Sequence, residues 1–238
     1  MGKHIVIPMA GRGIRFSEAG YTIPKPLIQI QGKTIIERAV ESLGIHGTYI
    51  FIVQKEHMEK FALGTLLNRI APNCKIIEID EITEGPACTA LLAKPYINNH
   101  HELVIANCDQ IMEWDAQKFL YEAVLHDGCV VTYHETTPKN SYARIDSKGN
   151  VLEIKEKEVI SNISLNGIHH WNCGYQFVDS AEEMIANDDR APNNEFYISQ
   201  SYNYMIKQGL SVGFFHIPNQ QHINVGVPDD LDRYLESL

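Results

Sequence analysis

The chain has 238 residues, of which 44% are hydrophobic and 21% are charged, proportions that are typical of a folded globular protein with a buried core. Its formal net charge of -10 disfavours a nucleic acid or an anionic membrane as partner, because an acidic surface repels both. No apolar run has the length of an export signal or a membrane helix, and the five cysteines show no Cys-x-x-Cys spacing, so we expect a cytoplasmic protein with reduced thiols.

Apolar runs alternate with helical patterns through the first half of the sequence. Strands are predicted at residues 5–7, 49–53, 75–79 and 103–106, and helices at 34–43, 57–70 and 87–93. Strands that read as continuous apolar runs are typical of a parallel sheet with helices on both faces. Ligands bind such sheets at the carboxyl ends of the strands, so we expect the loop after residue 7 and the segment after residue 106 to meet there.

The second half has the pattern of antiparallel strands. Strands are predicted at residues 129–133, 142–145, 151–154, 172–177 and 212–216, a hairpin turn at 147–150, and helices at 181–186, 194–207 and 229–236. We expect these strands to extend the first sheet and to wall a second pocket. Since no linker or repeat divides the chain, we predict a single domain, 1–238.

The loop after the first strand has the composition of a phosphate-binding segment. Gly11 and Gly13 let backbone N–H groups approach anionic oxygens, and the helix expected to follow adds the positive end of its dipole. Ala10 precedes these glycines, and Arg15 supplies a cation. On its own, Gly-x-Gly after a strand fits an ordinary tight turn equally well.

Lys25 lies between two prolines. Each proline fixes its own backbone angle φ and restricts the residue before it, so the lysine is rigidly held. A braced cation near a glycine-rich loop suits a polyanion such as a nucleoside triphosphate. The sequence lacks both the Gly-Lys-Ser/Thr of a P-loop and the third glycine of a dinucleotide fingerprint.

Asp109 follows the strand predicted at 103–106 and is expected at the same edge of the sheet. Mg²⁺ prefers hard oxygen ligands, which carboxylates and phosphates supply. The residue alone fits a turn-forming or helix-capping aspartate equally well, and Asn107 fits a loop cap.

The amino-terminal string resembles the signature of the sugar-phosphate nucleotidyltransferases, Gly-x-Gly-x-Arg followed after a gap by Pro-Lys-Pro-Leu. Here these residues are Gly11, Gly13, Arg15 and 24–27, and the variant at 20–22 is similar to that of compact bacterial enzymes of capsule biosynthesis. The resemblance implies a Rossmann-like, three-layer α/β fold, with a mixed, mostly parallel sheet and helices on both faces. It also implies a nucleotide-binding half, 1–110, and an acceptor-binding half, 111–238, within the single domain.

The resemblance further implies an Mg²⁺-dependent nucleotidyltransferase that moves a nucleoside monophosphate to a small phosphorylated acceptor and releases pyrophosphate. CTP is the favoured donor and L-glutamine phosphate the candidate acceptor, in capsular polysaccharide biosynthesis. UTP or dTTP with a sugar 1-phosphate is the first alternative, and a non-catalytic nucleotide sensor with the same fold is the second. We expect neither nucleic acid nor membrane as partner, and a homodimer is the candidate assembly.

By the same resemblance, Arg15 and Lys25 are the catalytic cations, Arg15 on the β- and γ-phosphates and Lys25 on the α-phosphoryl group. Asp109 is the expected metal ligand. The expected nucleotide-binding residues are Ala10, Gly11, Gly13, Glu84, Gly85 and Asn107. The residues around Glu84 also fit a plain helix entry, with Thr83 as N-cap and Pro86 in the first turn, and both interpretations can hold together.

The resemblance assigns the acceptor to Tyr142, Glu156, Lys157, Gly174 and Glu195. Lys157 is expected to neutralise the acceptor phosphate, Glu156 to accept hydrogen bonds, and Gly174 to let the acceptor lie close to the backbone. The residues alone leave open a solvated edge strand at 153–158, and a first-turn helix acid at Glu195. Alanine at position 143, where relatives carry glycine, suggests an acceptor unlike an ordinary hexose 1-phosphate.

Asn224 stands where most relatives carry the aspartate that is the second magnesium carboxylate. Either its neutral oxygen still binds the metal or another group completes the coordination. No histidines have the helical spacing of a zinc site, so catalytic zinc is disfavoured. His169 and His170 remain candidates for lining the acceptor pocket.

Overall fold

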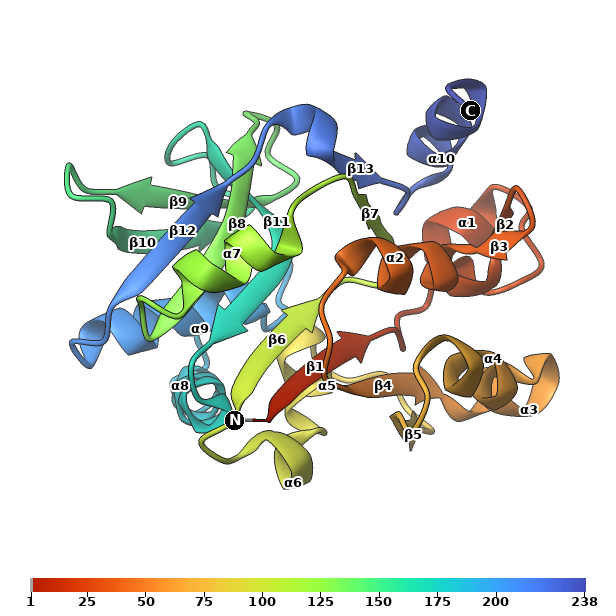
Figure 1. Ribbon diagram of the computed structural model, residues 1–238, viewed down its shortest axis with the longest axis horizontal. Coiled ribbons are helices and arrows are strands. Elements are labelled where there is room, and N and C mark those ends of the chain that lie inside the picture. Colours follow the sequence, from red (N-terminus) through yellow and green to blue (C-terminus); the bar gives the residue numbers. More distant parts are fainter. Residues whose placement is uncertain (1) are drawn as a thin grey trace.

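The centre of the fold is a sheet built from the strands that the first half of the sequence predicts. A computed structural model describes residues 2–238 and shows β1 (Lys3–Pro8), β4 (Thr48–Gln54), β5 (Lys75–Ile79) and β6 (Glu102–Ala106) as parallel neighbours in the order β6-β1-β4-β5. The expected α/β fold, a mixed, mostly parallel sheet between helices, is confirmed (Figure 1).

The strands of the second half extend this sheet from β6. They are β8 (Gly128–His134), β9 (Ser141–Ile145), β10 (Val151–Glu156), β11 (Ile163–Trp171) and β12 (Val212–His216). β11 runs antiparallel to β6 and also pairs with β8 and β9, while β10 joins β9 in the predicted hairpin. The result is one nine-stranded sheet.

Helices cover both faces of the sheet. They are α1 (Ile14–Glu18), α2 (Ile35–Leu43), α3 (Lys55–Phe61), α4 (Leu63–Ile70), α5 (Pro86–Leu91), α6 (Lys94–Ile97), α7 (Ala116–Ala123), α8 (Gly174–Ala186), α9 (Ile198–Lys207) and α10 (Pro228–Glu236). Alternate side chains of a strand point to opposite faces, so Ile5 and Ile7 pack with α2, α4 and α7, and Val6 packs with α5, α8 and α9. Within residues 2–238, no helix is both long and apolar enough to cross a membrane.

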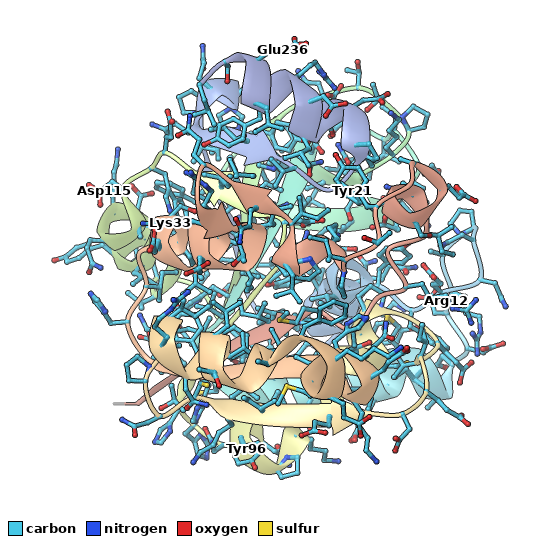
Figure 2. The ribbon with its side chains drawn as sticks, turned by 90° about the vertical axis from the view of Figure 1, so that its right-hand side faces the viewer. Arg12, Tyr21, Lys33, Tyr96, Asp115 and Glu236 are labelled. Carbon is cyan, nitrogen blue, oxygen red and sulfur yellow. The ribbon has the colours of Figure 1, made fainter. Side chains whose placement is uncertain are left out.

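Short elements gather where the parallel strands end. They are η1 (Lys25–Leu27), β2 (Gln29–Ile30), β3 (Lys33–Thr34), β7 (Gln110–Met112), η2 (Asn219–Gln221) and β13 (His222–Asn224). Phe16, Ile28, Ile111, Val225 and Leu231 belong to a small apolar cluster that ties α1, η1, β7 and α10 together. Figure 2 views the molecule from this side, with Arg12 and Tyr21 labelled.

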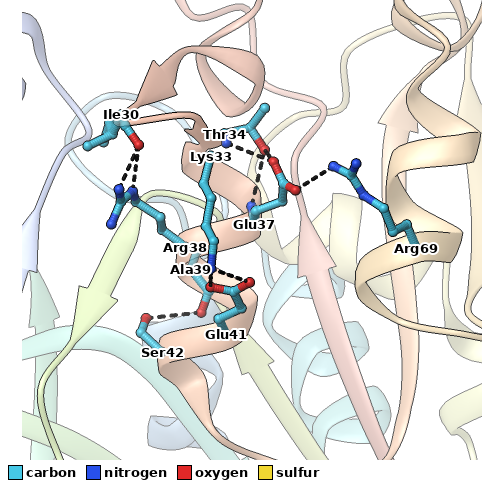
Figure 3. Close-up of polar contacts among 9 residues, drawn as sticks. All are labelled: Ile30, Lys33, Thr34, Glu37, Arg38, Ala39, Glu41, Ser42 and Arg69. Atoms are coloured by element: carbon cyan, nitrogen blue, oxygen red, sulfur yellow. Dashed lines mark hydrogen bonds and ion pairs between the residues drawn. The ribbon is translucent and has the colours of Figure 1, made fainter.

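The start of α2 shows why this helix was predictable. The Thr34 hydroxyl accepts a hydrogen bond from the backbone N–H of Glu37 at 3.3 Å, and the Glu37 carboxylate accepts one from the N–H of Thr34 at 2.8 Å (Figure 3). This capping box satisfies two amides that a helix start otherwise leaves unpaired. Arg69 of α4 donates to the same carboxylate at 2.5 Å. Burial favours a raised Glu37 pKa, but the Thr34 and Arg69 contacts hold that pKa below its ordinary value.

The single helix predicted at 57–70 is wrong. The chain forms α3 and α4 instead, separated by Ala62, whose φ of 49° lies in the left-handed region. The physical reason is that the two halves of the predicted helix bury different amounts of side chain. α4 buries Leu63 and Leu67, whereas α3 buries no residue, so one continuous helix would not have kept a single apolar face on the sheet.

The strand predicted at 172–177 is also wrong. α8 begins at Gly174, and the strand is β11, immediately before it. β11 escaped prediction because it buries polar side chains, among them Ser164, Asn166 and His170, within the sheet. The apolar spacing of α8, which buries Phe177, Val178, Ala181 and Met184, was the available signal for a helix.

The packing of α7 yields a stability prediction. Phe119 is fully buried and its ring lies 5.1 Å from that of Trp114 and 5.7 Å from that of Phe215. We expect Phe119→Ala to lower the free energy of unfolding by about 3–5 kcal/mol, because it removes buried surface and leaves a cavity. Tyr121→Ala on the same helix, where the side chain is 82% exposed, is the control and should leave the urea midpoint nearly unchanged. Equal losses in both variants would contradict this packing.

Candidate active site

The glycine-rich loop and the segment after β6 meet, as expected from the carboxyl ends of neighbouring parallel strands. They are connected through Lys25, which lies beside the loop and whose Nζ forms an ion pair with Asp109 Oδ2, 2.6 Å away. A methyl group built on Gly13 would lie 4.0 Å from Lys25 Cβ, so the loop lies directly beside this pair. Three segments that are distant in sequence thus converge at one edge of the sheet.

The ion pair is held on both sides by local structure. Lys25 begins the one-turn helix η1, with Pro24 as its N-cap and Pro26 inside it, and the two side chains of the pair are 22% and 17% exposed. Burial is the largest single influence and lowers the pKa of Lys25, but the charge of Asp109, its hydrogen bond and the neighbouring Cys108 together raise that pKa above its ordinary value. The lysine therefore stays a cation across the physiological range.

Asn224 lies beside Asp109 because β13 pairs with β7. The backbone N–H of Val225 donates to Asp109 O at 3.0 Å, which fixes the two segments together. A methyl group built on Gly226 would lie 2.6 Å from Asp109 Oδ2 and 2.9 Å from Asn224 Oδ1. Both oxygens therefore lie close together beside Gly226, whose N–H donates a hydrogen bond to Asn224 Oδ1 at 2.8 Å.

These two oxygens fit a magnesium ion. A carboxylate and an amide oxygen are hard donors of the kind that Mg²⁺ accepts, usually together with water and substrate phosphates. Within residues 2–238, no group of three or more His, Cys, Asp or Glu side chains converges as a metal centre would require. Asp109 and Asn224 could hold the ion as a partial site whose remaining ligands come from substrate.

Arg15 is exposed in the first turn of α1, two residues after Gly13. Asn107 is exposed as well, at the end of β6. Neither side chain donates or accepts a hydrogen bond among residues 2–238. Both residues therefore lie at the correct edge of the sheet with their polar groups available to a ligand.

Gly85 is required by a close contact within the chain. Its φ is 145°, and a methyl group there would lie 2.5 Å from Phe196 O and 2.6 Å from Phe196 N. Glu84 O accepts from the N–H of Phe196 at 3.0 Å, and Glu84 pairs with Arg190 at 2.6 Å. The expected Thr83 cap is wrong, because Gly85 is the N-cap of α5 and the Thr83 hydroxyl donates to Gly85 O instead.

Lys157 and Glu195 are brought together by Tyr197. Lys157 Nζ donates to the Tyr197 hydroxyl at 2.7 Å, and that hydroxyl donates to Glu195 Oε2 at 2.7 Å. Asn193 donates to both the hydroxyl and the carboxylate. Burial and the neighbouring Glu195 carboxylate raise the pKa of Tyr197. The four side chains form a connected polar cluster with one cation and one anion.

Glu156 and Tyr142 are turned into the protein. Glu156 is 6% exposed and accepts hydrogen bonds from Ser141 and Ser199, and burial raises its pKa. Tyr142 is fully buried and donates to Thr137 O at 2.5 Å. Both side chains are therefore committed to contacts within the protein, which argues against their expected place at the acceptor.

Gly174 lies at the opposite edge of the sheet, so its expected place at the acceptor is wrong. Its N–H donates to His101 O at 2.9 Å, next to the amino end of β6, and a side chain there would strike Ile97 O. Gly167 of β11, whose φ is 92°, packs instead against Asn107 at the carboxyl end of β6.

His169 and His170 do not line a pocket. Both are buried in β11, and burial lowers their pKa values to about 3 and about 4. Because desolvation disfavours the charged imidazole, both rings are neutral core residues at physiological pH. Their expected place in the acceptor pocket is corrected.

The comparison with known proteins gives the class of this α/β protein, a nucleotidyltransferase, and its family. Residues 5–162 match the MobA-like NTP transferase domain, so the chain belongs to that family. It is similar to the bifunctional protein GlmU of Methanocaldococcus jannaschii, with 27% identity over 206 residues, 85% of this chain and 47% of the relative. The GlmU of Methanococcus vannielii is 33% identical over 87% of this chain and 49% of the relative. The chain spans about half the length of these curated relatives.

Solved structures share the fold along nearly the whole chain. A nucleoside-diphosphate-sugar pyrophosphorylase of Vibrio cholerae superimposes with a TM-score of 0.86 at 24% identity, covering 98% of this chain and 99% of its own. A putative glucose-1-phosphate thymidylyltransferase of Bacillus anthracis gives 0.77 at 17% identity, with coverage of 99% and 95%. The inositol-1-phosphate CTP transferase of T. maritima gives 0.75 at 13% identity, with coverage of 99% and 94%.

Proposed function

We propose that this chain is a magnesium-dependent cytidylyltransferase that transfers CMP from CTP to a small phosphorylated acceptor and releases pyrophosphate. The observation that carries the proposal is the Lys25–Asp109 ion pair, 2.6 Å long, beside the glycine-rich loop at the carboxyl ends of β1 and β6. A cation and a metal-binding carboxylate at that position suit the transfer of a phosphoryl group.

The reaction needs no covalent enzyme intermediate. An oxygen of the acceptor phosphate forms a bond to the α-phosphorus, while the bond from that phosphorus to the bridging oxygen breaks and its electron pair leaves with pyrophosphate. Lys25 stabilises charge on the α-phosphoryl group, and Arg15 and the loop amides hold the β- and γ-phosphates. Positioning and charge neutralisation supply the catalysis. Asp109 and Asn224 would hold a magnesium ion, which would supply Lewis acidity to the transfer.

The acceptor is proposed to bind at the cluster of Lys157, Tyr197 and Glu195. Lys157 suits a phosphate, and Glu195 suits an ammonium, amide or hydroxyl donor within the same small molecule. Because Lys157 and Glu195 are joined through the Tyr197 hydroxyl, the cluster supports an acceptor that carries both a phosphate and an amino or amide group, such as L-glutamine phosphate. Such a product would serve capsular polysaccharide synthesis, the setting that the amino-terminal signature favours.

The assignment of the nucleotide donor rests on similarity to known enzymes. Resemblance to compact cytidylyltransferases, such as CTP:phosphoglutamine cytidylyltransferase, supports CTP, as does the fold shared with an inositol-1-phosphate CTP transferase. A UTP- or dTTP-dependent sugar-1-phosphate nucleotidyltransferase is the second candidate, supported by the thymidylyltransferase neighbour and by a UDP-glucose pyrophosphorylase of TM-score 0.76. Asn224 in place of an aspartate favours the third, a non-catalytic sensor.

A pyrophosphate-release assay separates these candidates. CTP, UTP, dTTP and ATP are each paired with L-glutamine phosphate, inositol 1-phosphate and hexose 1-phosphates in the presence of Mg²⁺. We expect release with CTP and an acceptor that carries an amino or amide group. Release with UTP or dTTP and a sugar 1-phosphate would replace the donor and acceptor assignments. Tight nucleotide binding without release from any pair would contradict the enzymatic function and support the sensor.

A further inference from the structure

Gln54 is the last residue of β4, which is held between β1 and β5 in the sheet. Its carboxamide nitrogen donates hydrogen bonds to two successive carbonyls of the glycine-rich loop, Ala10 O at 3.0 Å and Gly11 O at 3.0 Å. A carboxamide nitrogen carries two hydrogens, so each carbonyl takes one of them. The Gln54 side chain, at the end of a central strand, thus holds one side of the loop by two hydrogen bonds.

These two hydrogen bonds fix the direction of two backbone amide groups in the loop. A trans peptide unit is planar and its C=O and N–H bonds point in opposite directions. Because Ala10 O faces Gln54, the N–H of Gly11 points away from Gln54. Because Gly11 O also faces Gln54, the N–H of Arg12 points away from it as well.

The amides turned outward have no acceptor within the chain. Among the hydrogen bonds of residues 2–238, the N–H groups of Gly11, Arg12 and Gly13 donate to none. Gly13 has a left-handed φ of 62°. Successive N–H groups around a left-handed residue form a concave anion-binding arrangement, and the exposed residues Gly11 and Arg12 leave their amides accessible to an anionic ligand.

We propose that Gln54 is the positioning residue for the triphosphate. Its hydrogen bonds hold the Ala10 and Gly11 carbonyls on the side away from the nucleotide, so that the following amides face the β- and γ-phosphates. This inference rests on the proposed function, since it names a residue that shapes the same site. Glutamine is required for its donors. A glutamate of the same shape would offer none and would place a negative charge against two carbonyl oxygens and near the phosphates.

The test is equilibrium binding of CTP, CMP and inorganic pyrophosphate, with Mg²⁺, to the wild type, Gln54→Ala and Gln54→Glu. CMP lacks the two phosphates that the loop is expected to hold. We expect the dissociation constants of CTP and pyrophosphate to rise about tenfold in Gln54→Ala, the size of two neutral hydrogen bonds, and further in Gln54→Glu. The dissociation constant of CMP should change less than twofold, which a general loss of structure would not produce.

Gln117→Glu is the matched control, because this exposed glutamine of α7 undergoes the same change of charge far from the loop. It should bind all three ligands as the wild type does. If the wild type binds CTP much more tightly than CMP, and both Gln54 variants keep this preference, the inference about Gln54 is overturned, but the proposed function is not. If the wild type binds CTP no more tightly than CMP, the proposed function is overturned instead.

Discussion

Lys25→Ala is expected to lower kcat by about 10²–10³-fold, the usual effect of removing one preorganised charge from a transition state. The Lys25 ammonium is held close to the site, 2.6 Å from Asp109 Oδ2, and the prolines around it restrict its backbone. Because charge on the α-phosphoryl group grows as the new bond forms, a fixed cation is worth more in the transition state than in the ground state. The loss should therefore appear mainly in kcat, measured by pyrophosphate release at saturating substrates.

Two further variants sharpen this prediction. Lys33→Ala is the control, since Lys33 is an exposed lysine a few residues away that pairs with Glu41 (Figure 3), and its activity should match the wild type. Lys25→Arg keeps the charge but changes its shape and reach, so it should recover only part of the activity. Near-full turnover of Lys25→Ala with nucleotide binding intact would remove the lysine from the chemistry.

Asp109→Asn is expected to lower kcat/KM by about 10³-fold and to raise the magnesium concentration that gives half-maximal activity, because it removes the one carboxylate of the proposed metal site. Its neighbour Asn224 contributes only a neutral oxygen, and the two oxygens lie close together beside Gly226. No second carboxylate in this pair could compensate. Initial rates over a series of magnesium concentrations measure both effects.

The reciprocal change tests the same site in the opposite direction. Asn224→Asp restores a second negative charge, so half-maximal activity should need less magnesium than in the wild type. Asp232→Asn, at an exposed position on α10, is the control and should leave the magnesium dependence unchanged. If Asp109→Asn kept the wild-type magnesium curve, the metal would have to bind elsewhere.

The first half of the fold could be predicted because its strands are apolar on both faces. Buried parallel strands such as β1, β4 and β6 stand out as short runs of Val and Ile, and their topology fixes which loops meet. The convergence of the glycine-rich loop with Asp109 followed from that topology alone. The motif around Lys25 then predicted which cation would lie there.

The second half was harder, since buried polar residues conceal its central strand. β11 carries Asn166, His169 and His170 inside the protein, so it lacks the apolar run that marks β6. Because this strand was missed, the strand was predicted at 172–177 instead, where α8 begins. Gln54 was missed for a different reason, because one polar residue at a strand end has no periodicity, and its two hydrogen bonds exist only once the loop has folded back.

A crystal structure with Mg²⁺ and a non-hydrolysable CTP analogue tests the central claim, that the glycine-rich loop, Lys25 and Asp109 together hold a triphosphate. We expect the β- and γ-phosphates within hydrogen-bonding distance of the Gly11, Arg12 and Gly13 amides, Lys25 Nζ on the α-phosphate, and the metal on Asp109. A nucleotide bound at another surface, with Lys25 still paired to Asp109 and the loop amides without a ligand, would contradict the account.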